Sequence, residues 1–524
     1  MFKLTIKVGM LVAAMAVATS CVNDLDRVPK YEVTSASVYA DASNYKAVLA
    51  RLYATLAVSG QQGPAGKPDI TGIDEGTSNY MRLLWKLQEL PTDEAKIAWN
   101  DATIQDINKI TWTSSDGFIT AMYNRIFYLI SLSNEFIRET TDAKLAERSI
   151  TGQAATDAKT YRAEARFLRA MAYFHAIDMF GTVPFVTEAD APGSFLPRQA
   201  TRQELFTYVE SELKAIETEL AAPGAAEYGR ADRAAAQAIL ARLYLNAQVY
   251  TGTARYTDAI TYSKKVIDSG VYKLEPTYQN LFTADNNLSK EIIFPIAFDG
   301  TRTQTFGGMT FLVHAQVGGS MDVSSYGVNG GWAGIRSTQK LADAFPDATA
   351  AADKRGTFYT AGQQRDLNDL GTFTDGYAVS KYKNVTSTGQ PGSDQQFVDT
   401  DFPLIRLADM YLTYAESVLR GGTGGDQATA ISYVNLLRTR AKATTVGSIN
   451  LDFILAERAR ELYWEGYRRT DLIRYDRFVT NTYLWPWKGG VKEGRAVDVR
   501  FNLYPIPATD LVANPSLRQN GSGY

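Results

Sequence analysis

The side chains in this sequence that are best suited to contacting a ligand are aromatic. The 524 residues include 30 tyrosines, 23 phenylalanines and 7 tryptophans. Two tryptophans occur in loop-like surroundings, since Trp99 precedes Asn100 and Asp101, and Trp332 lies among glycines. A flat ring with polar groups beside it suits the apolar face and hydroxyl rim of a sugar ring. Trp99 and Trp332 are therefore the first candidates for a carbohydrate-contacting surface.

Catalytic patterns are scarce. The sequence contains no H-E-x-x-H, G-x-x-x-x-G-K-[ST] or G-x-S-x-G motif. Both histidines, His175 and His314, lie beside aromatic or apolar residues, where a packed or hydrogen-bonded role is favoured over catalysis. The sequence predicts a protein that is not an enzyme. A glycoside hydrolase on a helical scaffold remains an alternative, because a catalytic carboxylate pair could come from any of 57 acidic residues.

The charged residues favour a structural ion-pair network over a binding site for a charged partner. The chain has 54 basic and 57 acidic residues and no basic run, which argues against a nucleic-acid partner. The densest charged segment is 451–478, where acids and arginines alternate at helical spacing. This spacing predicts one charged helix whose side chains form an ion-pair network.

Oxygen-rich segments around Asp285, Asn287 and Asp401 are weak candidates for a metal site. Carboxylate and amide oxygens are the ligands that calcium prefers. The same residues are commoner in Asx-turns and helix caps. A structural calcium ion that braces loops is therefore one interpretation, and no cofactor is required for function.

Helical periodicity dominates the elements that must position these residues. Small and large apolar residues alternate at i, i+3, i+4 spacing, as in tetratricopeptide-like helix pairs. The predicted fold is mostly α, with one domain over 21–524, helix pairs and a loop-rich insertion at about 275–403. The pairs are expected at about 43–57, 120–180, 201–274 and 404–441. The long loops carry aromatics, which favours ordered, functional loops.

The N-terminus resembles an export signal. Two lysines precede an apolar run of about ten residues, which is too short to span a membrane. Small residues then lead to Cys21, the only cysteine in the sequence. We expect residues 1–20 to be a signal peptide that is removed, and Cys21 to carry a lipid as the only membrane anchor. An ordinary signal peptide with a chance cysteine is the alternative.

Several motifs resemble the SusD/RagB family of outer-membrane glycan-binding lipoproteins. They are R-A-E-A-R-F-L-R-A at 162–170, D-M-F-G at 178–181, E-R-A-R-E-L at 457–462 and L-Y-P-I-P at 503–507. The resemblance implies a cell-surface lipoprotein of the outer membrane, built on tetratricopeptide-like helices, that binds glycan without catalysis. It also implies a SusC-like TonB-dependent transporter as partner.

Further segments, at 72–76, 89–94, 229–232 and 483–490, are similar to the starch-binding member of that family. The likeness implies an α-glucan or malto-oligosaccharide ligand held by an arc of Trp99, Trp332 and Phe306. The starch binder has tyrosine where this chain has Phe306.

The same likeness places Arg82 and Asp74 near the polar contacts. An asparagine of the family is Ala102 here, and Asp101 would substitute for it. Two further alternatives to a starch-binding protein remain. One is a protein that binds a different polysaccharide, and the other is a peptide-binding repeat adaptor.

Overall fold

The computed structural model describes residues 35–190, 193, 195–521 and 523–524. The chain divides into two compact units, which meet in sequence at Tyr45 and Lys46. The described part of the first contains helix α2 (Ser35–Tyr39) and the 3₁₀ turn η1 (Ala42–Asn44). The second unit, from Lys46 onward, contains the candidate site. Cys21 and the expected signal peptide lie outside the described residues.

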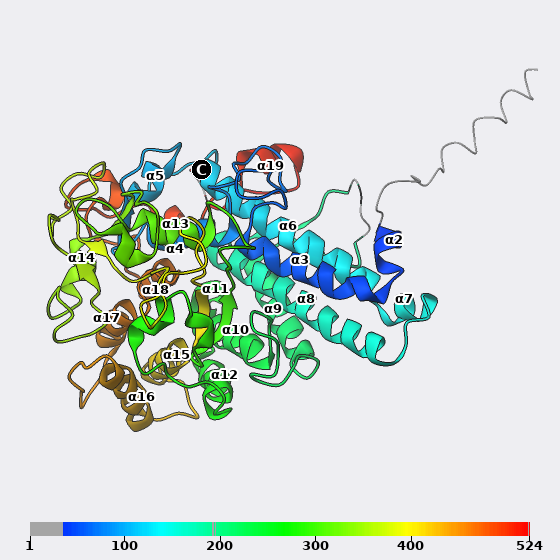
Figure 1. Ribbon diagram of the computed structural model, residues 1–524. Coiled ribbons are helices and arrows are strands. Elements are labelled where there is room, and N and C mark those ends of the chain that lie inside the picture. Colours follow the sequence, from blue (N-terminus) through cyan, green and yellow to red (C-terminus); the bar gives the residue numbers. More distant parts are fainter. Residues whose placement is uncertain (1–34, 191–192, 194, 522) are drawn as a thin grey trace, which may run out of the picture. The chain divides into compact units, whose positions relative to one another are not determined.

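The first helices of the second unit form a layer of neighbouring antiparallel helices. Helix α6 (Gly117–Glu139) packs on α8 (Gly152–Met179), and α8 packs on α9 (Arg202–Ile216) (Figure 1). Capping residues determine where two of them begin. The Asp116 carboxylate accepts hydrogen bonds from the first turn of α6, and Thr201 and Glu204 form a capping box at α9. The shorter helices of this region are α3 (Tyr45–Ala57) and α7 (Asp142–Glu147).

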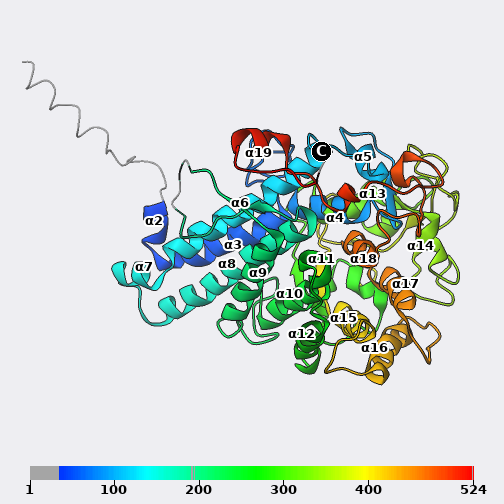
Figure 2. The ribbon, with the colours of Figure 1, turned by 180° about the vertical axis from the view of Figure 1, so that it is seen from behind.

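Further helix pairs continue this row toward the C-terminus (Figure 2). Helix α10 (Arg233–Leu245) packs on α12 (Tyr256–Asp268), which packs on α15 (Leu407–Leu419), and α15 packs on α16 (Gln427–Arg440). Helix α10 is rich in alanine and is buried along almost its whole length, so its neighbours can approach closely. The predicted mostly helical fold with packed helix pairs is confirmed by these elements.

The charged segment differs from the predicted single helix. It forms α17 (Leu451–Leu462) and α18 (Arg468–Arg474), separated by a break in which Trp464 has a positive φ of 64°. The break turns Trp464 inward, where its indole packs edge-on against Trp85. Burial of this large ring requires a change in chain direction that one continuous helix would not allow.

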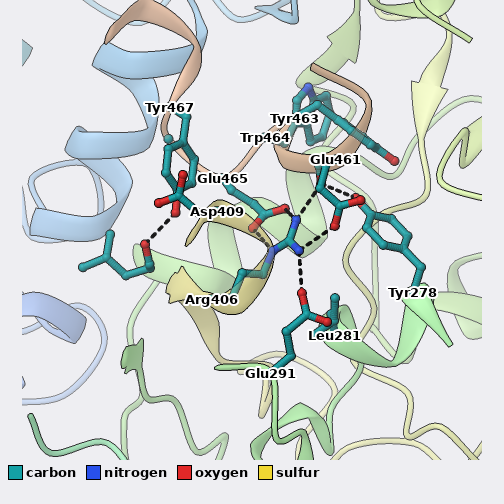
Figure 3. Close-up of polar contacts among 12 residues, drawn as sticks. Tyr278, Leu281, Glu291, Arg406, Asp409, Glu461, Tyr463, Trp464, Glu465 and Tyr467 are labelled. Carbon is teal, nitrogen blue, oxygen red and sulfur yellow. Dashed lines mark hydrogen bonds and ion pairs between the residues drawn. The ribbon is translucent and has the colours of Figure 1, made fainter. Parts of the chain in front are cut away.

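The predicted ion-pair network is present, and it is buried. The Arg406 guanidinium donates to Glu291 and Glu461 at 2.7 Å each and to Glu465 at 2.6 Å, and these four side chains are fully buried (Figure 3). Burial opposes ionisation of Glu461, but Arg440, Arg406 and Arg355 lower its pKa far below the usual range. The network therefore joins strand β8 (Phe402–Arg406) to α17 and the residues that follow α17.

Eight short strands pair two by two in antiparallel fashion within the described residues. Strand β1 (Ala95–Ile97) pairs with β5 (Ile335–Ser337), and β4 (Ile292–Ile296) with β8 (Phe402–Arg406). The other pairs are β2 (Val183–Pro184) with β3 (Gln199–Ala200) and β6 (Phe358–Tyr359) with β7 (Ala378–Val379). Most of these strands lie in the loop-rich part of the chain.

The remaining short elements lie mainly in and around these loops. They are α5 (Ile104–Lys109), α11 (Ala247–Thr251), α14 (Gln339–Asp343), α19 (Ala508–Ala513), η2 (Tyr278–Phe282), η3 (Asn286–Leu288), η4 (Val323–Tyr326), η5 (Lys488–Gly490) and η6 (Val499–Asn502). A search of the described residues for a helix long and apolar enough to cross a membrane finds none.

Candidate functional site

The two candidate tryptophans meet because β1 and β5 pair. Ile97 lies opposite Ile335, and beyond the strands the Ala98 amide donates to the Gly334 carbonyl at 2.8 Å. This register brings Trp99 beside Trp332, whose carbonyl accepts a hydrogen bond from the Trp99 indole at 3.0 Å. The ring centroids are 6.3 Å apart and the planes are tilted by 44°. Both side chains are half-buried, so each ring keeps an exposed part.

Helix α13 (Gly308–Ala315) supports both rings from below. The His314 imidazole stacks on the Trp332 indole with centroids 4.7 Å apart and planes 21° apart. Both His314 ring nitrogens face backbone carbonyls, those of Gly330 at 2.6 Å and Gln396 at 2.9 Å. Phe311 packs edge-on against Trp99 at 5.9 Å. These contacts hold the two indoles in fixed orientations.

Helix α4 (Tyr80–Glu89), which was not among the predicted helices, places Arg82 beneath Trp99. Figures 1 and 2 show α4 beside α13, and the two helices are in contact. The Arg82 guanidinium carbon lies 4.1 Å from the centre of the Phe311 ring and 5.8 Å from that of Trp99. Burial lowers the pKa of Arg82 to about 10, so the side chain stays charged at neutral pH.

Arg82 also connects Phe306 to the tryptophans. One terminal nitrogen donates to the carbonyls of Gly76 at 2.9 Å and Phe306 at 3.2 Å. The Phe306 ring is half-buried and packs against Phe397 with centroids 5.4 Å apart. Because Arg82 is only 5% exposed, its geometry suits positioning of the aromatic residues better than direct contact with a ligand.

The two predicted carboxylates lie on the surface of the same region. Asp74 is exposed and accepts a hydrogen bond from the Thr77 amide at 2.7 Å. Asp101 is exposed too, and it is close enough to Arg82 to interact with the guanidinium charge. The next residue, Ala102, has a positive φ of 43°, a conformation that asparagine adopts more readily than alanine. The structure thus brings all six predicted glycan-contacting residues into one region.

The oxygen-rich loops do not form a metal cluster. Within the described part of the chain, no group of three or more His, Cys, Asp or Glu residues is arranged to hold an ion. Asp285 instead accepts hydrogen bonds from Thr283 and Ser387, and Asp401 accepts from Phe298 and Tyr228. Asn287 is exposed. None of these contacts is an Asx-turn or a helix cap, because Asp285 makes no capping hydrogen bond to η3 and the partners of Asp401 lie more than 100 residues away.

Sequence reasoning missed Phe311 and helix α4 as supports of the site, whereas the packed, hydrogen-bonded role predicted for His314 is confirmed. The apolar stretch before His314 was a usable signal, because an aromatic-rich segment next to glycine-rich Trp332 could have been expected to pack against it. Helix α4 had a signal as well, since its apolar residues recur at i, i+3, i+4 and i+7 spacing (Tyr80, Leu83, Leu84 and Leu87). What the sequence does not show is that its charged residues Arg82 and Lys86 are buried too.

Comparisons with known proteins agree with this fold. A family model described as "SusD family" matches residues 350–524, and one described as "Starch-binding associating with outer membrane" matches residues 71–245. The chain is 38% identical to the starch-binding protein SusD of Bacteroides thetaiotaomicron, over 97% of this chain and 96% of that protein. A SusD-like protein of Bacteroides ovatus is 25% identical over 97% of this chain and 90% of its own length.

Solved structures share the fold at lower identity. Surface glycan-binding protein A from B. thetaiotaomicron, in complex with laminarihexaose, superposes with a TM-score of 0.69 at 19% identity, covering 91% of this chain and 99% of that one. Surface glycan-binding protein A from Bacteroides uniformis has a TM-score of 0.70 at 19% identity, covering 92% and 99%. Given the extent and identity of the match to the B. thetaiotaomicron protein, the chain belongs to the SusD family.

Proposed function

We propose that this protein is a cell-surface, non-catalytic binder of starch-like α-glucans that delivers them to a TonB-dependent outer-membrane transporter. The observation that carries the proposal is that three half-buried rings, Trp99, Trp332 and Phe306, lie in one region on a support of buried side chains, where the family resemblance implies an arc. An arc of aromatic rings suits a curved α-1,4-glucan, because successive sugar faces can stack on it. The 38% identity to a protein named for starch binding also supports it.

Removal of either indole tests the site. We expect Trp332→Ala, and separately Trp99→Ala, to lower the affinity for maltoheptaose at least tenfold. Geometry-specific contacts between aromatic rings contribute about 0.5–1.5 kcal/mol beyond buried area, and about 1.4 kcal/mol corresponds to a factor of ten. Phe306→Ala should cost less, because a phenyl ring presents a smaller face. Isothermal titration gives the affinities.

Two controls make the result interpretable. Circular dichroism should show little loss of helicity, since both indoles stand on loops outside the helix row. Trp487→Phe is a matched control, because this indole donates to the Leu367 carbonyl in a different loop. Unchanged affinity in both tryptophan variants would refute the site.

The linkage of the glycan needs a separate test, because one structural relative was solved with laminarihexaose. Purified protein should be incubated with amylose, pullulan, laminarin and unrelated glycans. We expect retention on the α-glucans without release of reducing ends. Retention on laminarin alone would mean that the ligand is another polysaccharide and not starch. Release of reducing ends would favour the alternative of a glycoside hydrolase.

Delivery at the cell surface requires a membrane anchor, which we assign to Cys21. No segment of the sequence reaches about 18 uninterrupted apolar residues. We expect Cys21→Ser to move the protein from the outer-membrane fraction to the soluble fraction, in cells that lack the transporter. A Ser20→Ala variant, which keeps the thiol, should still fractionate with the membrane. Membrane retention of Cys21→Ser would contradict the assignment.

A further inference from the structure

An exposed aromatic ring stands between two hollows that none of the three rings of the proposed arc lines. Tyr228, in the loop before α10, is 47% exposed. One hollow is lined by Tyr228, Asn287, Asp299, Thr301, Ser393 and Asp399. The other is lined by Tyr228, Asn287, Glu227, Arg230, Tyr272 and Lys290. Since Tyr228 and Asn287 line both hollows, they lie between the two.

The Tyr228 ring is held in place from within the protein. Its hydroxyl donates to one Asp401 carboxylate oxygen at 2.5 Å, and the other oxygen accepts from the Phe298 amide at 2.7 Å. Asp401 is only 2% exposed, so the anchor is buried while the ring reaches the surface. An aromatic ring fixed in advance loses little conformational entropy when a ligand stacks on it.

Polar groups suited to sugar hydroxyls surround this ring. The exposed Asn287 side-chain amide has no hydrogen-bond partner among the described residues, which leaves its donors and acceptor available. In the first hollow, the side chain of Asp299 is 42% exposed and accepts hydrogen bonds from Thr301 through one of its oxygens. The half-buried Asp399 accepts from Gly300 and Ser393. A carboxylate oxygen has more than one acceptor site, so both groups can also accept from sugar hydroxyls.

One folded loop connects this region to the proposed arc. Residues 297–307 join β4 to α13, and within them the Asp299 carbonyl accepts from the Arg302 and Thr303 amides at 3.0 and 2.8 Å. Near the end of this loop, Phe306 packs against Phe397. One loop therefore contributes Asp299 and Thr301 to the first hollow and Phe306 to the arc.

We propose that Tyr228 and Asn287 form a second carbohydrate site for neutral α-glucan chains, so that one polymer engages this site and the arc together. This inference rests on the proposed function. Linked sites raise the affinity for a polymer more than for a short ligand, because binding at the second site becomes intramolecular. The second site would thus favour long glucans over short ones.

The test compares a short and a long ligand. We expect Tyr228→Ala and Asn287→Ala to leave the maltoheptaose affinity within twofold of wild type, and to weaken amylopectin binding in affinity gels about five- to tenfold. Tyr228→Phe, which keeps the ring, should retain most amylopectin binding. Asn481→Ala is the matched control, because this exposed asparagine lines neither hollow.

A second measurement isolates the new site. In the double variant Trp99→Ala/Trp332→Ala, amylopectin should still protect amides at 225–230 and 284–288 from hydrogen exchange, and adding Tyr228→Ala should remove that protection. Unchanged amylopectin binding in both single variants, with maltoheptaose binding dependent on Trp332, would overturn the second site and leave the proposed function intact. Wild-type protein that binds neither glucan would overturn the proposed function itself.

Discussion

The Trp99 indole lies so close to Gly334 that a side chain there has no room. A Cβ atom built on Gly334 would lie 2.6 Å from two carbons of the indole and 3.0 Å from its nitrogen. Trp99 is also in contact with Phe311 and hydrogen-bonded to the Trp332 carbonyl, so the ring cannot move aside without losing those contacts. Gly334 is therefore part of what orients the proposed arc.

We expect Gly334→Ala to lower maltoheptaose affinity about tenfold, similar to loss of a ring, because the indole must leave its place in the arc. Titration calorimetry measures the affinity, and a shift of tryptophan fluorescence reports the displaced ring. Gly330→Ala is the matched control, since a Cβ there meets nothing within 4 Å. Equal affinity of the Gly334→Ala and Gly330→Ala variants would show that the close approach does not matter for binding.

At the scale of elements, the buried ion pairs between β8 and α17 make stability depend on single charges. Four carboxylate oxygens of Glu291, Glu461 and Glu465 accept hydrogen bonds from the Arg406 guanidinium. All four side chains are fully buried. Removing one partner of a buried pair leaves an uncompensated charge and typically costs about 3–5 kcal/mol. A surface pair contributes at most about 1 kcal/mol.

Arg406→Met should therefore lower the free energy of unfolding by about 3–5 kcal/mol. Arg365→Met is the comparison, because Arg365 pairs with Asp343 and Asp366 at the surface, where all three side chains are roughly half exposed. Its effect should stay below about 1 kcal/mol. Urea unfolding followed by circular dichroism measures both. Similar losses in the two variants would mean that solvent reaches the Arg406 network.

Predictability from sequence also differs between elements. The helix pairs were predictable because their apolar spacing is visible in the letters, as in Ala238, Ala241 and Tyr244 of α10. The break at Trp464 was not, because the buried charge of Glu465 beside it is compensated by Lys381 and Arg406, far away in the sequence. Helix α4 has visible apolar spacing, but the burial of its charged Arg82 is not visible in the letters. Periodicity assumes that charged residues face solvent, and here many do not.

The candidate site was also predictable only in part, for a different reason. Residue types alone singled out Trp99 and Trp332, and family resemblance added Phe306, Arg82 and Asp74. Their proximity depends on pairing of β1 with β5 across more than 200 residues of chain, which one sequence does not reveal. The stack of His314 under Trp332 depends on the same pairing.

At the scale of the whole molecule, the buried histidine makes stability depend on pH. The chain has only two histidines. Burial lowers the pKa of His175 to about 4, with Asp178 opposing and Arg242 adding to the shift. The imidazole contacts the Tyr80 hydroxyl at 2.8 Å inside the helix layer. Because an unfolded histidine has a pKa near 6.5, the unfolded chain binds this proton first as pH falls.

The free energy of unfolding should consequently fall as pH drops from 6.5 toward 4, with His175 contributing about 2 kcal/mol of that loss between pH 7 and pH 5. Other groups titrate in this range, so the contribution is read as a difference between variants. His175→Gln should give a shallower profile than wild type, whereas Tyr80→Phe, which keeps the buried imidazole, should retain the slope. Urea unfolding at pH 5, 6 and 7 measures it. A His175→Gln profile parallel to that of wild type would mean that the pKa of His175 is the same in the folded and the unfolded chain. Burial in the helix layer would then not be what keeps this imidazole neutral.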